Sequence, residues 1–515
     1  TSTLAGIYGG TQTTTHEVNG RAYRGGVVGS LSKWWWGQPI APDEDRMKMH
    51  LPLAADLCTL SADLLFGEAP QFIFRKPSTA TDAADAPKQQ WAHPAQDRLE
   101  LIIGTDEAHA ELLLLGEYAA ALGGSYLSVA WDPDVHDHVF PKSHAADCAI
   151  PEFRHGRLVR VRLWTEYRDG NVIFRLIEDH TRGQIDYGLY RGTDKTLGEL
   201  VPMSTRPETA HYETLRNESD LAVAIANPAA LPLSVRIGTG SDRLAVVYMP
   251  NARPVRDWRK LGALANLGRS DLDGIQDVLD KIDQAWSSLM RDIDNGQGRL
   301  IVDEAMLELS GKPGEGATFD TYRQVFTAVG ATPGKSADGG SAITVAQFNI
   351  RVEEHLKTIE ALKREIASAV GYSESHLGIA GASGLKTATE IDADLSDSER
   401  TRDKKALYAK AALSRWALVA LEIDFQVFGG GALGDMTAAP DVVFAPVSQA
   451  DPEKLARTAQ LLDAARAASR KEIVRTVHPT WDEDEIEVEA DAIIAEMGKP
   501  APDPATFDGI DPNEP

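Results

Sequence analysis

The chain has 515 residues, of which 43% are hydrophobic and 25% are charged, and its formal net charge at pH 7 is −25. These fractions are ordinary for a globular protein, and the length suffices for about two to four domains. A protein that grips DNA through its phosphates concentrates lysine and arginine on one face and is often basic overall. The acidic balance therefore argues against tight, sequence-specific nucleic-acid binding, but leaves passing contact with DNA open.

The two cysteines, Cys58 and Cys148, lie far apart and suggest neither a disulfide framework nor a thiolate metal cluster. No apolar run approaches the roughly 18 residues that a membrane span requires. The N-terminal residues lack the basic start and apolar middle of a signal peptide. We therefore expect a soluble protein without membrane contact.

Hydrophobic periodicity predicts two helices and a strand in the N-terminal part. The first helix starts after Pro52 and ends at Gly67, and the second runs from a Thr105 cap to Gly123. A strand is expected at 125–131. Residues 76–97, rich in Ala, Pro, Asp and Thr, are predicted to be a loop.

Residues 157–192 have the alternation of a half-buried β-sheet. In the first strand Val159, Val161 and Leu163 alternate with arginines. Two further strand-like segments follow glycine turns at Gly170 and Gly183. The pattern predicts an antiparallel β module.

The second half is predicted to be mainly helical, which makes the fold class α+β. One long helix opens with a capping box formed by Ser270 and Asp273, and another begins near Thr344 and ends at Gly371. Further helices are expected over 387–428 and 451–497, with a strand at 441–447 between them. The Pro- and Asp-rich tail after residue 497 is expected to be disordered.

The stretch GIAGASGLKTATEID, residues 378–392, looks at first like a phosphate-binding loop. That motif needs glycine, lysine and serine or threonine in direct succession. Here Leu385 separates Gly384 from Lys386, and no buried strand is expected to feed the loop. We therefore predict no nucleotide site and no cofactor.

Three other segments have competing interpretations. Asp132, Asp134, His136 and His138 resemble a metal site, but a polar turn after a strand is favoured. Residues 34–36, three consecutive tryptophans, suit a stacking platform or, preferably, an interface or core. The acidic run 481–491 is by default a solvated face. No catalytic motif and no metal site are predicted.

Four segments, taken in order, resemble portal proteins of tailed bacteriophages with long non-contractile tails. They are RMKMHLPLAADLCTLSADLLFGEAP, GRSDLDGIQDVLDKIDQAWSSLMRDID, GYSESHLGIAGASGLKTATEID and AARAASRKEIVRTVHPTWDEDEIEVEADAI. The resemblance covers roughly residues 44–497, and it rests on the order and total length of the segments more than on any one of them.

The resemblance implies a portal fold with wing, stem, clip and crown, assembled as a ring of about twelve subunits around a central channel. Double-stranded DNA is packaged and ejected through such a ring at one capsid vertex without specific binding. The family does not hydrolyse ATP, so the chain is not expected to be an enzyme. Implied partners are the terminase large subunit, head-completion or connector proteins, and the major capsid and scaffolding proteins. The implied location is the virion, after assembly in the host cytoplasm.

Carried onto this sequence, the resemblance implies the following domain limits: a flexible N-terminal arm at 1–43, the wing at 44–265, the first stem helix at 266–296, the clip at 297–343, the second stem helix at 344–370, the tunnel loop at 371–386, a long helix with a return to the wing at 387–449, the crown at 450–497 and a disordered acidic tail at 498–515.

Two groups of residues are implied to face the DNA. The tunnel loop offers small, flexible residues near one lysine: Gly378, Gly381, Ser383, Gly384 and Lys386. The first stem helix is strongly acidic, and its candidates for lining the channel are Asp273, Asp277, Asp280 and Lys281. About twelve chains of charge −25 would carry roughly −300, so DNA is expected to slide through the ring.

Two alternatives stay open on the sequence alone. A different structural capsid or connector protein would share the helices and the acidic surface but lack the channel. A metal-dependent hydrolase would use residues 132–138.

Overall fold

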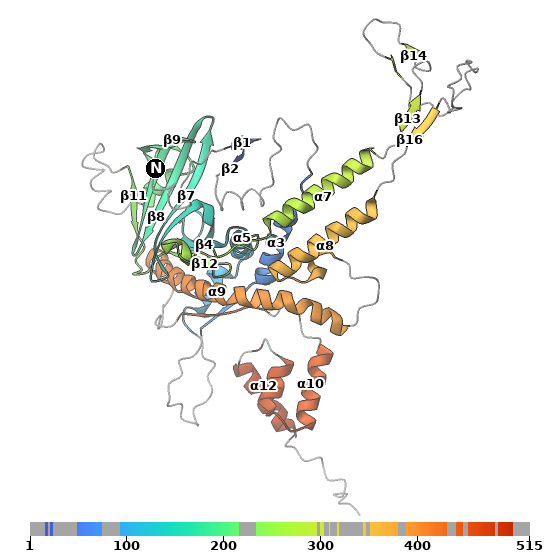
Figure 1. The fold of residues 1–515 in the computed structure, drawn as a ribbon. Helices are drawn as coiled ribbons and strands as arrows, with labels where there is room; N and C mark the ends of the chain where they lie inside the picture. Colours follow the sequence, from blue (N-terminus) through green and yellow to red (C-terminus); the bar gives the residue numbers. More distant parts are fainter. Residues whose placement is uncertain are drawn as a thin grey trace, which may run out of the picture.

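The computed structural model describes residues 16–18, 21–23, 49–74, 93–215, 233–295, 299–302, 308–309, 317–318, 343–346, 351–379, 388–429, 439–445, 452–478, 481 and 483–497. Figure 1 shows a mixed body of sheet and helix, with a long helical hairpin that extends away from it. The predicted α+β class is confirmed. The tryptophans at 34–36, the tail at 498–515 and most of the loop predicted at 76–97 lie outside the described residues.

The predicted N-terminal helices are confirmed. Helix α3 spans Leu53–Phe66, and α5 spans Asp106–Leu122 and packs against it. The Thr105 hydroxyl accepts a hydrogen bond from the amide of Ala108 at 3.2 Å, as expected of a helix cap. A short helix α4, Gln96–Ile103, was not predicted, because its eight residues give little periodicity.

Two antiparallel sheets form the β part of the body. The smaller sheet has the order β12-β4-β5, with β4 at Gly124–Ala130, β5 at Phe140–Ala145 and β12 at Val246–Pro250. The larger sheet has the order β10-β9-β8-β7-β6, and β11 also pairs with β9. Its strands are β6 Ala149–Arg154, β7 Arg157–Asp169, β8 Val172–Thr181, β9 Gln184–Thr193, β10 Thr196–Val201 and β11 Val235–Gly238. The predicted antiparallel module with turns at Gly170 and Gly183 is confirmed.

Helix α9, Ala388–Phe428, runs along the body and completes its core (Figure 1). The indole of Trp416, fully buried, donates a hydrogen bond to the carbonyl of Ser128 in β4 at 3.1 Å. The strand that follows, β17 at Asp441–Val443, pairs with β3 at Gln71–Ile73. This pairing returns the chain from α9 to the N-terminal helices.

Helices α7, Gln276–Asn295, and α8, Val352–Val370, lie side by side as the hairpin of Figure 1. Strand β13, Arg299–Val302, pairs with β16, Ile343–Ala346, beyond their far ends. Two short ladders complete the set of strands, β14 Glu308–Leu309 with β15 Ala317–Thr318 and β1 His16–Val18 with β2 Arg21–Tyr23.

The predicted starts of both hairpin helices are wrong. The Ser270 hydroxyl accepts from the amide of Leu272 and lies 2.7 Å from the carbonyl of Ala121, so it forms no capping box with Asp273. Gly274 has φ of +88°, a left-handed conformation that interrupts the helix and delays α7 until Gln276. Thr344 lies in β16, because β-branched neighbours and a partner strand favour an extended chain.

A hydrophobic cluster joins the base of the hairpin to the body. It contains buried residues of α3, of the end of α5, of α7 and the turn before it, and of α8, among them Leu57, Ala120, Leu279 and Ile366. The chain after α8 contributes Tyr372 to the same cluster. The hairpin is therefore fixed at its base by shared core packing.

Three helices form the C-terminal unit: α10 Pro452–Ala464, α11 Arg470–Val477 and α12 Glu483–Met497. They pack in sequence, α10 on α11 and α11 on α12. The prediction that residues 451–497 are helical is confirmed for the described residues.

Candidate functional site

The segment between α8 and α9 is held on α9 at its beginning. Gly371 caps α8 with φ of +85°, and its carbonyl accepts a hydrogen bond from the Thr401 hydroxyl at 2.7 Å. A short 3₁₀ helix, Glu374–Leu377, follows. Ile379 is buried at the end of this part. Residues 371–379 therefore form an ordered base at the start of the connection from α8 to α9.

A compact polar cluster fixes this base. The Ser398 hydroxyl of α9, fully buried, accepts a hydrogen bond from the amide of Ser373 at 2.9 Å. It also lies 2.9 Å from Nδ1 of His376, which is 3.0 Å from the Ser373 hydroxyl. Because each group has its partner within the cluster, these residues position the chain rather than offer a reactive hydroxyl.

Of the five candidate loop residues, the structure describes Gly378. It ends the 3₁₀ helix with φ of +68°, and a Cβ built there would meet nothing within 4 Å. The left-handed backbone conformation therefore favours glycine at this position, whereas space for a side chain is not limiting. Gly381, Ser383, Gly384 and Lys386 lie outside the described residues.

The four candidate residues near α7 differ in exposure. Asp277, Asp280 and Lys281 are exposed on the first turns of the helix, and the Lys281 ammonium donates to the Gln284 side chain at 3.0 Å. Asp273 is half-buried in the turn before the helix, and burial raises the pKa of its carboxyl group. The helix thus offers a small exposed acidic surface at its start.

Three other aspartates of the same stretch bind within the chain. Asp283 accepts from His50 at 2.7 Å and from the amide of Leu51 at 3.0 Å. Asp292 accepts from His355 of α8 at 3.1 Å, and this hydrogen bond lowers the pKa of its carboxyl group. Asp271 is buried in the body. A count of carboxylates in the sequence therefore overstates the charge that this stretch presents to its surroundings.

A buried ionic cluster that was not predicted from the sequence lies where the hairpin meets the body. The Lys405 ammonium of α9 donates to Asp271 at 2.5 Å, to the Ser61 hydroxyl at 2.6 Å and to the Tyr372 hydroxyl at 2.9 Å. Burial opposes the charge of Lys405, but Asp271 and Tyr372 outweigh it and raise the pKa of the ammonium. Asn251 donates to the second Asp271 oxygen at 2.7 Å. The cluster links five separate segments.

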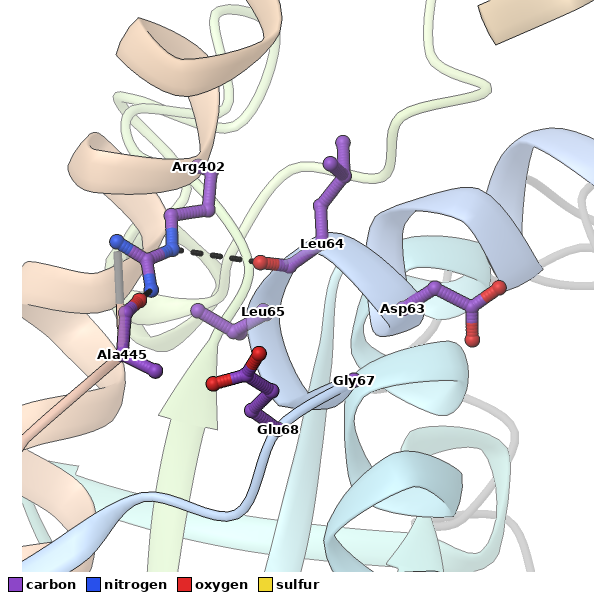
Figure 2. A pocket seen from close by; sticks show the side chains of 7 residues that line it. All are labelled: Asp63, Leu64, Leu65, Gly67, Glu68, Arg402 and Ala445. Atoms are coloured by element: carbon purple, nitrogen blue, oxygen red, sulfur yellow. Dashed lines mark hydrogen bonds between the residues drawn. The ribbon is translucent and has the colours of Figure 1, made fainter. Parts of the chain in front are cut away.

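A hollow of about 200 Å³ lies near the C-terminal end of α3 (Figure 2). The guanidinium of Arg402 lies at its edge, donating to the carbonyl of Leu64 at 3.3 Å and to that of Ala445. Asp63 and Glu68 also line it. Because Arg402 already binds two backbone carbonyls and Asp403, its role is to hold α3, α9 and the end of β17 together.

Residues 132–138 form a polar turn. The carbonyl of Asp132 accepts from the amides of Val135 and His136, each at 3.0 Å, and His138 lies 3.0 Å from the Asp137 carboxylate. Within the part of the chain that the structure describes, no group of three metal-binding side chains is found. The turn interpretation is therefore the one that the geometry supports.

A second buried polar cluster lies between the two sheets. The Ser128 hydroxyl is 2.9 Å from Nε2 of His144, and Oε2 of Glu178 is 3.3 Å from Nε2 of His180. Burial lowers the pKa of His144 to about 3. Burial would raise the pKa of Glu178, but Lys142 and His180 hold it well below its ordinary value. These groups affect stability at low pH.

Comparison with known proteins identifies the class. Residues 250–494 match the family model described as phage portal protein, SPP1 Gp6-like. This segment includes α7, α8, α9 and the C-terminal helices. The resemblance to phage portal proteins is therefore confirmed over residues 250–494.

Solved structures similar to the chain include parts of gene transfer agent (GTA) particles. They are the neck of an empty GTA particle computed with C6 symmetry (14% identity, TM-score 0.43, covering 90% of this chain and 92% of that chain), the virion of the native particle (15%, 0.43, 92% and 97%) and the neck of the native particle computed with C12 symmetry (14%, 0.41, 95% and 97%). No curated protein matches the chain. Among the described residues, no helix is both long and apolar enough to span a membrane.

Proposed function

We propose that the chain forms the portal ring at one capsid vertex, through which double-stranded DNA is packaged and ejected. The observation that carries this proposal is the family match over residues 250–494, which include the α7–α8 hairpin and the segment after it. A hairpin fixed at its base by a shared core suits a rigid wall element. Its copies, arranged around an axis, would enclose a channel.

In this proposal each part of the molecule takes one role. The body before α7, with its two sheets, is the wing, and α7 and α8 are the stem. Strands β13 and β16 belong to the clip, α10–α12 to the crown, and the chain between α8 and α9 to the tunnel loop. The ordered base at 371–379 supports this role, because a projecting loop needs a fixed point of attachment.

The charges of the hairpin suit passage of DNA better than binding. The exposed carboxylates of Asp277 and Asp280 would repel a phosphate backbone, and Lys281 lies beside them. Exposed charges act over about 10 Å at 0.1 M salt. The acidic surface would therefore repel the duplex, and Lys386 would make a weak contact with its phosphates.

The proposed partners follow from the same role. They are the terminase large subunit, which would supply ATP hydrolysis, the head-completion or connector proteins, and the major capsid and scaffolding proteins. The chain itself would have no catalytic function. It would assemble in the host cytoplasm and reside at the portal vertex of the virion.

Native mass measurement and negative-stain imaging of the purified full chain test the proposal. We expect closed rings of about twelve subunits, or thirteen when the protein is made alone, each with a central channel. A monomer or dimer across a wide concentration range, with no ring in the images, would contradict it.

A further inference from the structure

The C-terminal unit of α10–α12 has very little core of its own. Among its described residues the buried cluster consists of Val474, Ile486 and Ala490, with Ile493 packed against it. Units of about 45 residues rarely gain enough stability from one small core without a staple or a partner. The unit therefore needs further contacts.

The outer faces of two of its helices carry large exposed apolar side chains. On α10, Leu461 is 64% exposed, and on α12, Val488 is 69% exposed. Val488 lies two residues after buried Ile486, which places it on the opposite side of the helix. Ala492 and Ala495 follow at helical spacing and are also exposed. Each helix thus has a face that stays exposed among the residues that the structure describes.

Charges are segregated between these helices. Residues 452–478 contain six basic and three acidic side chains, whereas 481–497 contain eight acidic side chains and no basic one. Arg457 is exposed one turn before Leu461, and Glu489 and Asp491 are exposed next to Val488. Within one chain, the Lys471 ammonium of α11 already lies 3.5 Å from the Glu487 carboxylate of α12, which is an ion pair between the two charge sets.

We propose that the α10 face around Arg457 and Leu461 docks against the α12 face around Val488 of a second copy of this chain. The apolar side chains would cover one another, and Arg457 would meet the carboxylates that flank Val488. Pairing of α12 with itself would bring like charges together, which disfavours a contact between two α12 helices. In the proposed ring each copy offers its α10 face to one neighbour and its α12 face to the other, a head-to-tail contact of the type that closes into rings. The inference rests on the proposed ring assembly.

Cysteine cross-linking of the full chain tests this contact directly. In a Cys148→Ser background, which removes a half-exposed thiol, Leu461→Cys and Val488→Cys are introduced together and treated with a bismaleimide. We expect a ladder of covalent multimers longer than dimers on a denaturing gel. Each single cysteine variant is the matched control and should stay monomeric on the same gel.

Charge exchange gives a second, independent readout. Arg457→Glu alone, or Glu489→Lys with Asp491→Lys, should raise the concentration needed for half-assembly at least about tenfold at low salt. An equal mixture of the two variants should restore assembly, because each acidic face then meets a basic one. Restoration also shows that both variants are folded.

The outcomes separate this inference from the ring proposal. Rings of normal mass whose double-cysteine variant remains monomeric on the denaturing gel would overturn the docking contact and leave the ring intact. Covalent dimers from Val488→Cys alone would overturn the head-to-tail arrangement. A monomeric mass without intermolecular cross-links would contradict both the proposed ring and the docking contact.

Discussion

The ammonium of Lys405 lies 2.5 Å from the carboxylate of Asp271, with both side chains buried. One belongs to the long helix α9, and the other to the turn that leads into α7. Removal of one member of a buried ion pair leaves an uncompensated charge, which costs about 3–5 kcal/mol. The pair therefore fixes where the hairpin leaves the body.

Lys405→Met should lower the free energy of unfolding by about 3–5 kcal/mol, because Asp271 keeps its charge without its partner. Lys405→Met combined with Asp271→Asn should recover much of that loss, since no buried charge remains. Chemical denaturation followed by tryptophan fluorescence measures both. Lys404→Met, at an exposed neighbouring position, is the matched control and should stay near the wild type. Equal losses in the single and double variants would show that the charge is not the cause.

Acid should destabilise the protein in two steps. The pKa of buried His144 falls from 6.5 to about 3, so between these values the unfolded chain binds a proton that the native chain does not. The stability contributed by neutral His144 is therefore lost as pH falls below 6.5, by roughly 1.4 kcal/mol per pH unit. The pKa of Glu178 lies below its ordinary 4.5, so a second proton adds to the slope below that pH.

His144→Gln tests this assignment, because it keeps a polar partner for Ser128 but removes the titrating ring. The slope of the unfolding free energy against pH, measured between pH 6 and 5, should fall by about 1.4 kcal/mol per pH unit, which corresponds to one proton. His155→Asn, at an exposed turn position, is the control and should leave the slope unchanged. An unchanged slope in His144→Gln would assign the acid sensitivity to other groups.

Reversal of the exposed charge at the start of α7 should make the ring retain DNA. Asp277→Lys with Asp280→Lys should still assemble, because both side chains are exposed. Retention of duplex DNA on purified rings should rise about tenfold at low salt and fall steeply as salt is added. Asp134→Lys with Asp242→Lys makes the same change of charge on exposed positions of the body. If both double variants retain DNA equally, overall charge and not the hairpin decides passage.

Local signals were enough to predict many elements. Thr105, with its side-chain cap, and Gly371, at a helix end, mark boundaries that depend only on neighbouring residues. The α7 start was missed because a short-range pattern of Ser270 and Asp273 competes with contacts to Ala120 and Ala121, which lie about 150 residues away in sequence. A local sequence pattern contains no information on contacts between residues so far apart in the sequence.

The ionic cluster was beyond prediction for a related reason. Lys405 and Asp271 are 134 residues apart, and the densely charged first half of α9 resembles a solvated face along its whole length. Burial of one lysine among many follows from the packing of α3, α9 and the turn before α7. A single sequence gives no direct signal of that packing.

Stiffening of the tunnel loop should impair DNA handling without preventing ring formation. Gly381→Pro with Gly384→Pro removes backbone freedom and two potential amide donors. The base at 371–379 is held by Ser398 and Thr401 of α9, so the changes should not disturb the body. We expect procapsids that carry the portal but contain less packaged DNA or lose it after filling. Packaging assays and quantification of the portal in procapsids measure the two effects separately.

Lys386→Glu addresses the same loop through charge. Added repulsion toward phosphate should reduce DNA retention at low salt, and the effect should weaken as salt screens it. Gly381→Ala with Gly384→Ala is the matched control for the proline pair, because it changes the same positions but keeps both amide donors. Loss of ring assembly in the proline variant would place the loop in a subunit interface. Unchanged packaging in all three variants would mean that the loop does not meet the DNA.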